Sequence, residues 1–203
     1  HTPESLVALK SAFARSFGDA PPPVFGAPEP AAIKQSERLW WFDIVHNVFY
    51  RVGMFEAFDE FFEDVFARFE QPESWRLFPE TLAVLTALKE QGFELGIISN
   101  FDSRLFSVLR GLGIADLFDT VTISSLAHAA KPSARIFHQA LEKHAVDPDE
   151  ALHVGDSERD DVKGAQGVGL TGVLLARGEG ARPSGGTTIG TLNELLPLLS
   201  RLQ

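Results

Sequence analysis

The sequence predicts an α/β fold in which a parallel sheet carries helices on both faces and a separate helical domain precedes it. Two observations support this prediction. Residues 1–76 show helical periodicity throughout, whereas from residue 77 onwards short apolar runs alternate with helical segments. Alternation of this kind is typical of βαβ units, whose strands pair in parallel while their helices cover the sheet. We therefore expect a helical domain at 1–76 and an α/β domain at 77–203.

The composition narrows the classes of function. The 203 residues are 44% hydrophobic and carry a net charge of −10, with a pI near 5.0. That charge argues against binding to a nucleic-acid backbone, which needs a basic surface. An anionic substrate would need a local cationic site. The chain has no cysteine, which fits a reducing compartment, and no apolar run long enough to span a membrane. We expect a cytoplasmic protein with no nucleic-acid or membrane partner.

The helical part is expected to contain a series of amphipathic helices. Thr2 and Pro3 resemble the N-cap and first position of the first helix. Ser36 is expected to cap the second helix and Gly53 to end it. The next helix carries phenylalanines spaced three and four residues apart, which places them on one broad face. We expect this face to pack between helices, although its exposed rings could help to line a substrate cleft.

The α/β part is expected to alternate helices and strands along its whole length. The predicted helices cover residues 81–92, 103–113, 134–145, 160–169 and 191–203, and the predicted strands cover 93–99, 120–125, 151–155 and 171–176. The runs at 93–99 and 151–155 are apolar nearly throughout, which predicts strands buried on both faces. Residues 177–188, RGEGARPSGGTT, are expected to form a loop.

Polar side chains follow three of the predicted strands. Ser99 and Asn100 end the first, Lys131 lies in the loop after the second, and an acidic stretch that includes Asp156 and Asp161 follows the third. In open parallel sheets, ligands bind beyond the carboxyl ends of the strands. A cation, a hydroxyl and an amide suit a phosphate, whereas carboxylates suit Mg²⁺. We expect the acids to gather around a metal, whose charge would offset their mutual repulsion.

Each of these residues also has a purely structural explanation. Ser99 and Asn100 could turn the chain out of its strand. Lys131 could be a solvated surface lysine. Asp160 and Asp161 could be acids of a first helical turn, favoured by the helix dipole. Their joint placement at strand ends favours the functional interpretation.

The motifs IISN, KPSARIF and HVGDSERDDVKGA together resemble those of the haloacid dehalogenase-like hydrolase superfamily. The resemblance is to its phosphatase-type members with a helical cap. It runs from about residue 75 to residue 176 and more loosely through the helical part. It implies a Rossmann-like α/β core at 77–203, an α-helical cap at 1–76, and Mg²⁺-dependent hydrolysis of a small phosphorylated metabolite.

The resemblance also implies roles for particular residues. Ser99 and Asn100 would bind the phosphoryl group, and Lys131 would neutralise both this group and the nucleophile. Asp156 and Asp161 would bind Mg²⁺, the second being placed by a spacing of five residues. Asp160, at the spacing of four that other members use, is a rival metal ligand. Lys131 and Ser99 would therefore be the catalytic residues within these 203 residues.

One motif of the superfamily has no counterpart in the sequence. The resemblance implies a nucleophilic Asp on a central strand, which forms an aspartyl-phosphate, but no D-x-D follows an apolar run here. The DPD at 147–149 precedes its strand and therefore lies at the wrong end of the sheet. Either the nucleophile lies upstream of residue 1, so that these 203 residues would be inactive alone, or the protein is a phosphate-binding pseudo-enzyme. Dehalogenation of a haloacid is a further alternative, which the acid-rich motif disfavours because that reaction needs no metal.

Overall fold

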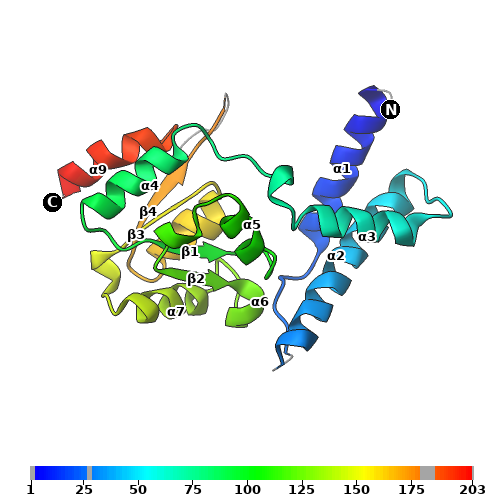
Figure 1. The fold of residues 1–203 in the computed structure, drawn as a ribbon, viewed down its shortest axis with the longest axis horizontal. Helices are drawn as coiled ribbons and strands as arrows, with labels where there is room; N and C mark the ends of the chain where they lie inside the picture. The colour runs from blue at the N-terminus through cyan, green and yellow to red at the C-terminus, as the bar shows by residue number, and fades with distance from the viewer. Residues whose placement is uncertain (1–2, 27–28, 179–185, 203) are drawn as a thin grey trace.

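The structure is a computed structural model that describes residues 3–26, 29–178 and 186–202 (Figure 1). Three helices form a body beside the α/β part, on the right of Figure 1. They are α1 (Pro3–Asp19), α2 (Pro30–Val52) and α3 (Phe58–Arg68). We call them the helical bundle. No helix of the described residues is long and apolar enough to cross a lipid bilayer.

The second helix begins earlier than the sequence predicted. It begins at Pro30 rather than after Ser36, whose hydroxyl donates a hydrogen bond to the carbonyl of Ala32 at 2.9 Å. Pro30 explains the difference, because its fixed φ suits the first helical turn. The predicted end at Gly53 is confirmed: its φ is 127° and its N–H bonds to the carbonyl of Phe49. The predicted cap at Thr2 lies outside the described residues.

The phenylalanines of α3 divide between the interior of the bundle and its surface. Phe58 and Phe62 are buried and contact the ring of Phe42 on α2, with ring centroids 5.6 and 5.0 Å apart. Phe61 and Phe69 are exposed. The expected packing between helices is therefore confirmed for Phe58 and Phe62.

The α/β part follows the predicted alternation. Its helices are α4 (Thr81–Glu90), α5 (Leu105–Gly111), α6 (Ser124–Ala127), α7 (Ala134–His144), α8 (Gly164–Gln166) and α9 (Leu195–Leu202), and a π-helical turn, Glu158–Lys163, precedes α8. Its strands are β1 (Gly96–Ser99), β2 (Thr120–Ile123), β3 (Leu152–Gly155), β4 (Thr171–Leu175) and β5 (Thr187–Ile189). Strand β5 corrects the prediction of a loop over residues 177–188, because its threonines and isoleucine are β-branched and suit a strand.

The strands form two parallel ladders rather than one sheet. β1 pairs with β2, so that Ser99 lies opposite Ile123, and β3, β4 and β5 pair in that order. Among the described residues, no ladder joins β1 to β3. Direct pairing of these strands, which would have favoured the pseudo-enzyme alternative, is therefore not observed.

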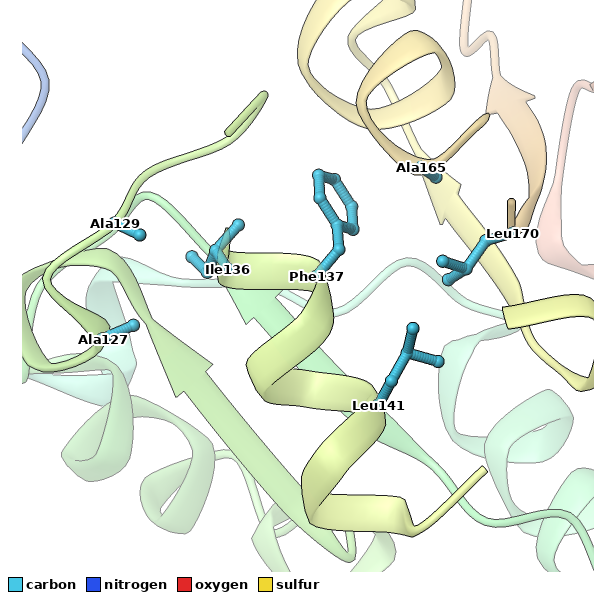
Figure 2. Packing of buried hydrophobic residues seen from close by; sticks show 7 residues of the cluster. All are labelled: Ala127, Ala129, Ile136, Phe137, Leu141, Ala165 and Leu170. Carbon is cyan, nitrogen blue, oxygen red and sulfur yellow. The ribbon is translucent and has the colours of Figure 1, made fainter. Parts of the chain in front are cut away.

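Two clusters of apolar side chains pack against segments of both ladders. The first, shown in Figure 2, includes Phe137 and Leu141 of α7, which project towards Ala165 and Leu170. Ile98 of β1 packs against this cluster. The second lies among α4, β4, β5 and α9, and Phe93 and Leu95, which precede β1, pack against it together with Leu152 and Val154 of β3. The expected arrangement of parallel strands with helices on both faces is therefore confirmed, with the strands in two ladders.

The burial of β1 and β3 differs from the prediction. Both strands are only partly buried, and Gly96 is exposed, whereas Val173 of β4 is fully buried. β4 has a hydrogen-bonded neighbour on each side, while β1 and β3 each have one neighbour in the described residues. The prediction of fully buried strands was wrong because each lacks a second neighbour here.

Candidate active site

The carboxyl ends of β1 and β3 bring together residues that are far apart in the sequence. Lys131 Nζ donates a hydrogen bond to Asp161 Oδ1 at 2.6 Å, and both side chains are largely buried, with 14% and 4% exposed. Lys131 follows β2 and α6, whereas Asp161 lies in the π-helical turn after β3. This ion pair therefore joins the β1–β2 half of the sheet to the β3–β5 half.

The side-chain amide of Asn100 fixes the backbone of Lys131. Its Nδ2 donates to the carbonyl of Lys131 at 3.0 Å, and its Oδ1 accepts from the Lys131 N–H at 2.8 Å. Asn100 directly follows the last residue of β1. The lysine therefore has a defined position relative to the strand end, as a preorganised cation requires.

Asp161 is held by several donors at once. Its Oδ1 also lies 2.9 Å from Nε2 of His153, and its Oδ2 accepts from the Ser157 N–H at 3.0 Å. Burial alone would raise the pKa of Asp161. The hydrogen bond from His153, the charge and hydrogen bond of Lys131 and the Ser157 N–H outweigh burial and hold this pKa well below its usual range. The carboxylate is therefore ionised and oriented.

Gly155 allows Asp161 to approach the strand end. A Cβ built on Gly155 would lie 2.1 Å from Cγ of Asp161, closer than any real contact. The glycine at the end of β3 is therefore required by the position of the acid. The sequence motif places the two residues six apart, but only the structure shows that they touch.

Ser99 has a local structural partner. Its Oγ accepts a hydrogen bond from the N–H of Phe101 at 3.0 Å, which turns the chain out of β1. This is the structural role that the sequence left open. It leaves the hydroxyl proton of Ser99 able to donate to a ligand.

The acidic stretch does not gather as expected. Among the described residues, no group of three or more His, Asp or Glu side chains is placed to hold a metal ion. Asp156 is exposed, and the carboxylate of Asp160 lies 3.9 Å from Nε of Arg159. Glu158, Asp160 and Asp161 belong to the π-helical turn Glu158–Lys163, in which Asp161 is buried. Of the predicted acids, only Asp161 contacts Lys131.

The donor chemistry at the strand ends nevertheless fits Mg²⁺. Asp156 and Asp161 supply carboxylate oxygens, which Mg²⁺ prefers. Proteins often bind Mg²⁺ through one or two carboxylates, and waters and substrate phosphates complete the shell. A site with two carboxylates therefore fits these residues, and a site built from the whole acidic stretch does not.

Sequence reasoning missed several buried polar residues around this site. They are His153 on β3, Glu37 on α2, and Asp102 and Arg104 after β1. His153 interrupts an apolar strand, which is a signal that could have been used. Asp102 and Arg104 follow Ser99 at short spacing. Nothing local in the sequence marks Glu37, because its partners are distant in the chain.

A pocket lies elsewhere, in the helical bundle. It has a volume of about 280 Å³ and lies between α1 and α2, lined by residues that include Asp19, Asp43 and Arg51. No residue of the strand-end site lines it. Its position therefore gives no support to binding at the strand ends, which depends on the contacts described above.

Comparison with known proteins shows which family this chain resembles. Residues 7–169 match the family model of haloacid dehalogenase-like hydrolases. The chain belongs to the haloacid dehalogenase-like hydrolase family. It is 34% identical over 172 residues to the bovine (Bos taurus) haloacid dehalogenase-like hydrolase domain-containing protein 3, covering 81% of this chain and 68% of that protein. The chain spans 57–68% of the length of the vertebrate proteins of this name.

Two further relatives within this family are informative. A glyceraldehyde 3-phosphate phosphatase of Methanothermobacter thermautotrophicus is 36% identical over 101 residues, which are 49% of this chain and 45% of that protein. The crystal structure of a phosphatase of the family from Thermococcus onnurineus superimposes with a TM-score of 0.63 at 28% identity. The match covers 96% of this chain and 88% of that chain. The fold and the hydrolase family are thereby established.

Proposed function

We propose that this protein is a Mg²⁺-dependent phosphatase that acts on a small phosphorylated substrate. The Lys131–Asp161 ion pair, tied to the end of β1 by Asn100, is the observation that carries the proposal. It places a cation and a carboxylate side by side at the strand ends of a chain with a net charge of −10. An anionic substrate needs a local cation of this kind.

Each residue has a role in the proposed reaction. Ser99 and Asn100 would bind oxygens of the phosphoryl group, and Lys131 would neutralise its charge. Asp156 and Asp161 would bind Mg²⁺, which when bound would neutralise charge on the phosphoryl oxygens. His153 would keep Asp161 oriented, as residues behind metal ligands commonly do. Asp160 is a weaker candidate because its carboxylate lies near Arg159 instead of Lys131.

The nucleophile would come from outside these 203 residues. We propose that a further strand lies between β1 and β3 in the complete protein and ends in the nucleophilic Asp. The incomplete burial of both strands and their lack of a ladder to one another support this arrangement. A strand in that position would end beside Lys131, whose ammonium could then neutralise the nucleophile.

The helical bundle would act as a cap. In this proposal residues 1–76 form the cap and 77–203 the core, with the boundary between α3 and α4. Closure of such a cap excludes water from the site and completes the substrate pocket. The side chains of the bundle would then select the substrate.

The test is an assay of the complete protein on a panel of phosphate monoesters, with and without Mg²⁺. The panel includes glyceraldehyde 3-phosphate, and chloride release from 2-chloropropionate is followed in parallel. We expect phosphate release that disappears when Mg²⁺ is removed. Chloride release without Mg²⁺ would assign dehalogenation instead. Saturable binding of inorganic phosphate without any turnover would assign a pseudo-enzyme.

A further inference from the structure

Glu37 lies at the centre of a buried polar network between the helical bundle and the strand ends. It is 3% exposed, and its carboxylate accepts hydrogen bonds from the Ser103 N–H at 3.0 Å and from Ser103 Oγ at 2.5 Å. Ser125 Oγ donates to it as well. Among the described residues, no lysine, arginine or histidine forms an ion pair with Glu37.

These donors explain how a buried carboxylate is tolerated without a cation. Burial of a charge is costly unless hydrogen bonds replace its water. Here the hydrogen-bond donors come from two different segments of the α/β part. Ser103 follows β1, and Ser125 lies in α6, which follows β2. The carboxylate on α2 therefore links the ends of both strands.

A second set of contacts holds the same segment from the bundle. Asp102 and Arg104 form a buried ion pair at 2.6 Å. Trp41 Nε1 of α2 donates to Asp102 Oδ2 at 2.6 Å, and Arg104 Nη1 donates to the carbonyl of Phe66 in α3 at 2.7 Å. The guanidinium also lies 3.7 Å from the centre of the Phe66 ring. Two helices of the bundle, α2 and α3, thus contact the segment that follows Asn100.

The segment held in this way, residues 99–104, is the one that supplies the proposed phosphate ligands. We call it the phosphate loop. Ser99 accepts from the Phe101 N–H within the loop, and Asn100 fixes Lys131. A shift of the loop would therefore move a hydroxyl, an amide and the catalytic lysine together.

We infer that Glu37 is a positioning residue: from the helical bundle it fixes the phosphate loop, and so sets the positions of Ser99, Asn100 and Lys131 for the phosphoryl group. The effect on phosphate binding rests on the proposed function, whereas the fixing of the loop does not. The hydrogen bonds of Glu37 go to Ser103 and Ser125 and not to Ser99 or Lys131, so Glu37 acts through Ser103 and the loop.

The experiment compares Glu37→Leu and Glu37→Gln in the complete protein. Leucine has a similar size and no acceptor, while glutamine keeps one acceptor oxygen. Glu63→Gln is the control, because Glu63 of α3 makes an exposed ion pair with Arg38 of α2 and not with the loop. Amide hydrogen exchange is measured at a temperature where each variant is folded.

We expect the Ser103 amide to exchange at least about tenfold faster in Glu37→Leu, since it loses a charged acceptor. Glu37→Gln should fall between this variant and the wild type. Exchange at Val173 in β4 should not change, and Glu63→Gln should match the wild type at Ser103. Unchanged exchange at Ser103 would overturn the inference, and so would equal acceleration at Val173, which would indicate a general loss of stability.

Inhibition by inorganic phosphate gives the second readout. If the loop positions the phosphate ligands, the inhibition constant should rise and kcat should fall in the order wild type, Glu37→Gln, Glu37→Leu. Faster Ser103 exchange with unchanged inhibition and kcat would overturn the positioning role. Faster exchange in a complete protein that hydrolyses no phosphate ester would refute the proposed function and leave the fixing of the loop intact.

Discussion

At the scale of single residues, the candidate site contains a largely buried cation, Lys131, in an acidic chain. Lys131 is mostly buried, paired with Asp161 and fixed through its backbone by Asn100. A charge held in this way needs little reorganisation when a substrate binds. Lys163, in the π-helical turn, is by contrast exposed, and its Nζ lies 3.7 Å from Glu158 Oε1.

Lys131→Met should therefore abolish most of the activity of the complete protein. We expect kcat/KM to fall at least about a hundredfold, the scale of losing one preorganised electrostatic contact. Lys131→Arg should not restore it fully, because a planar guanidinium does not replace a compact ammonium. Lys163→Met is the control and should stay within a few-fold of the wild type. If kcat/KM of Lys131→Met also stayed within a few-fold of the wild type, Lys131 would have only a structural role.

The metal ligands can be distinguished by amide substitutions. We expect Asp161→Asn to weaken Mg²⁺ binding, measured by calorimetry, more than Asp160→Asn does. Asp161 lies beside Lys131 and His153, whereas Asp160 lies beside Arg159. Asp156→Asn should abolish Mg²⁺-dependent turnover. A larger loss of affinity in Asp160→Asn would mean that the metal ligand lies one position earlier.

At the scale of elements, the junction between β3 and the π-helical turn determines where Asp161 lies. A Cβ on Gly155 would overlap Asp161, since the closest atom would be 2.1 Å away. Gly155→Ala should therefore displace the acid and lower the free energy of unfolding by about 1–3 kcal/mol, as overpacking commonly does. Urea denaturation measures this change. Gly18→Ala, where a Cβ meets nothing within 4 Å, is the control. Equal stability of the two variants would contradict this close contact.

Asp119 connects α4 to the start of the β1–β2 ladder. Its carboxylate accepts from Lys89 Nζ at 2.7 and 2.8 Å and from the Leu95 N–H at 2.8 Å. The hydrogen bonds from Lys89 and Leu95, with the charges of Lys89 and His144, lower the pKa of Asp119 despite partial burial. An acid whose folded pKa is depressed stabilises the fold above its unfolded pKa.

Asp119→Asn should therefore lower the free energy of unfolding at pH 7. The difference from the wild type should shrink as the pH falls below about 4, the usual pKa of an unfolded aspartate, and through the folded pKa. Urea denaturation at pH 7, 5 and 3 tests this, with the exposed Asp116→Asn as control. A difference that persists or grows at pH 3 would argue against the linkage.

At the scale of the whole molecule, the sequence predicted those features of the fold that depend on local sequence pattern. The alternation of helices and strands, the end of α2 at Gly53, and the strand-end positions of Ser99, Lys131 and Asp161 all follow from periodicity and capping. The ion pair between Lys131 and Asp161 was not predicted, although it agrees with the rule that carboxyl ends of parallel strands meet at one edge.

Other features could not be read from the sequence because they depend on distant partners. Glu37 is buried by Ser103 and Ser125, which lie 66 and 88 residues away. The chain after β3 forms a π-helical turn that buries Asp161, and no pattern in the sequence predicted that geometry. Strand β5 was missed because its few residues follow a glycine-rich stretch that resembles a loop.

The division between β1 and β3 has a consequence for handling the protein in solution. Each strand has a backbone edge without a ladder partner in the described residues, and such edges are templates for strand pairing with other molecules. We expect this 203-residue chain alone to self-associate with rising concentration, in a way that light scattering detects. The complete protein should remain monodisperse under the same conditions if its own strand covers these edges. The 203-residue chain should become more soluble when an apolar peptide ending in D-x-D is added in excess. Monodisperse behaviour of the short chain at high concentration would show that the two edges are already protected.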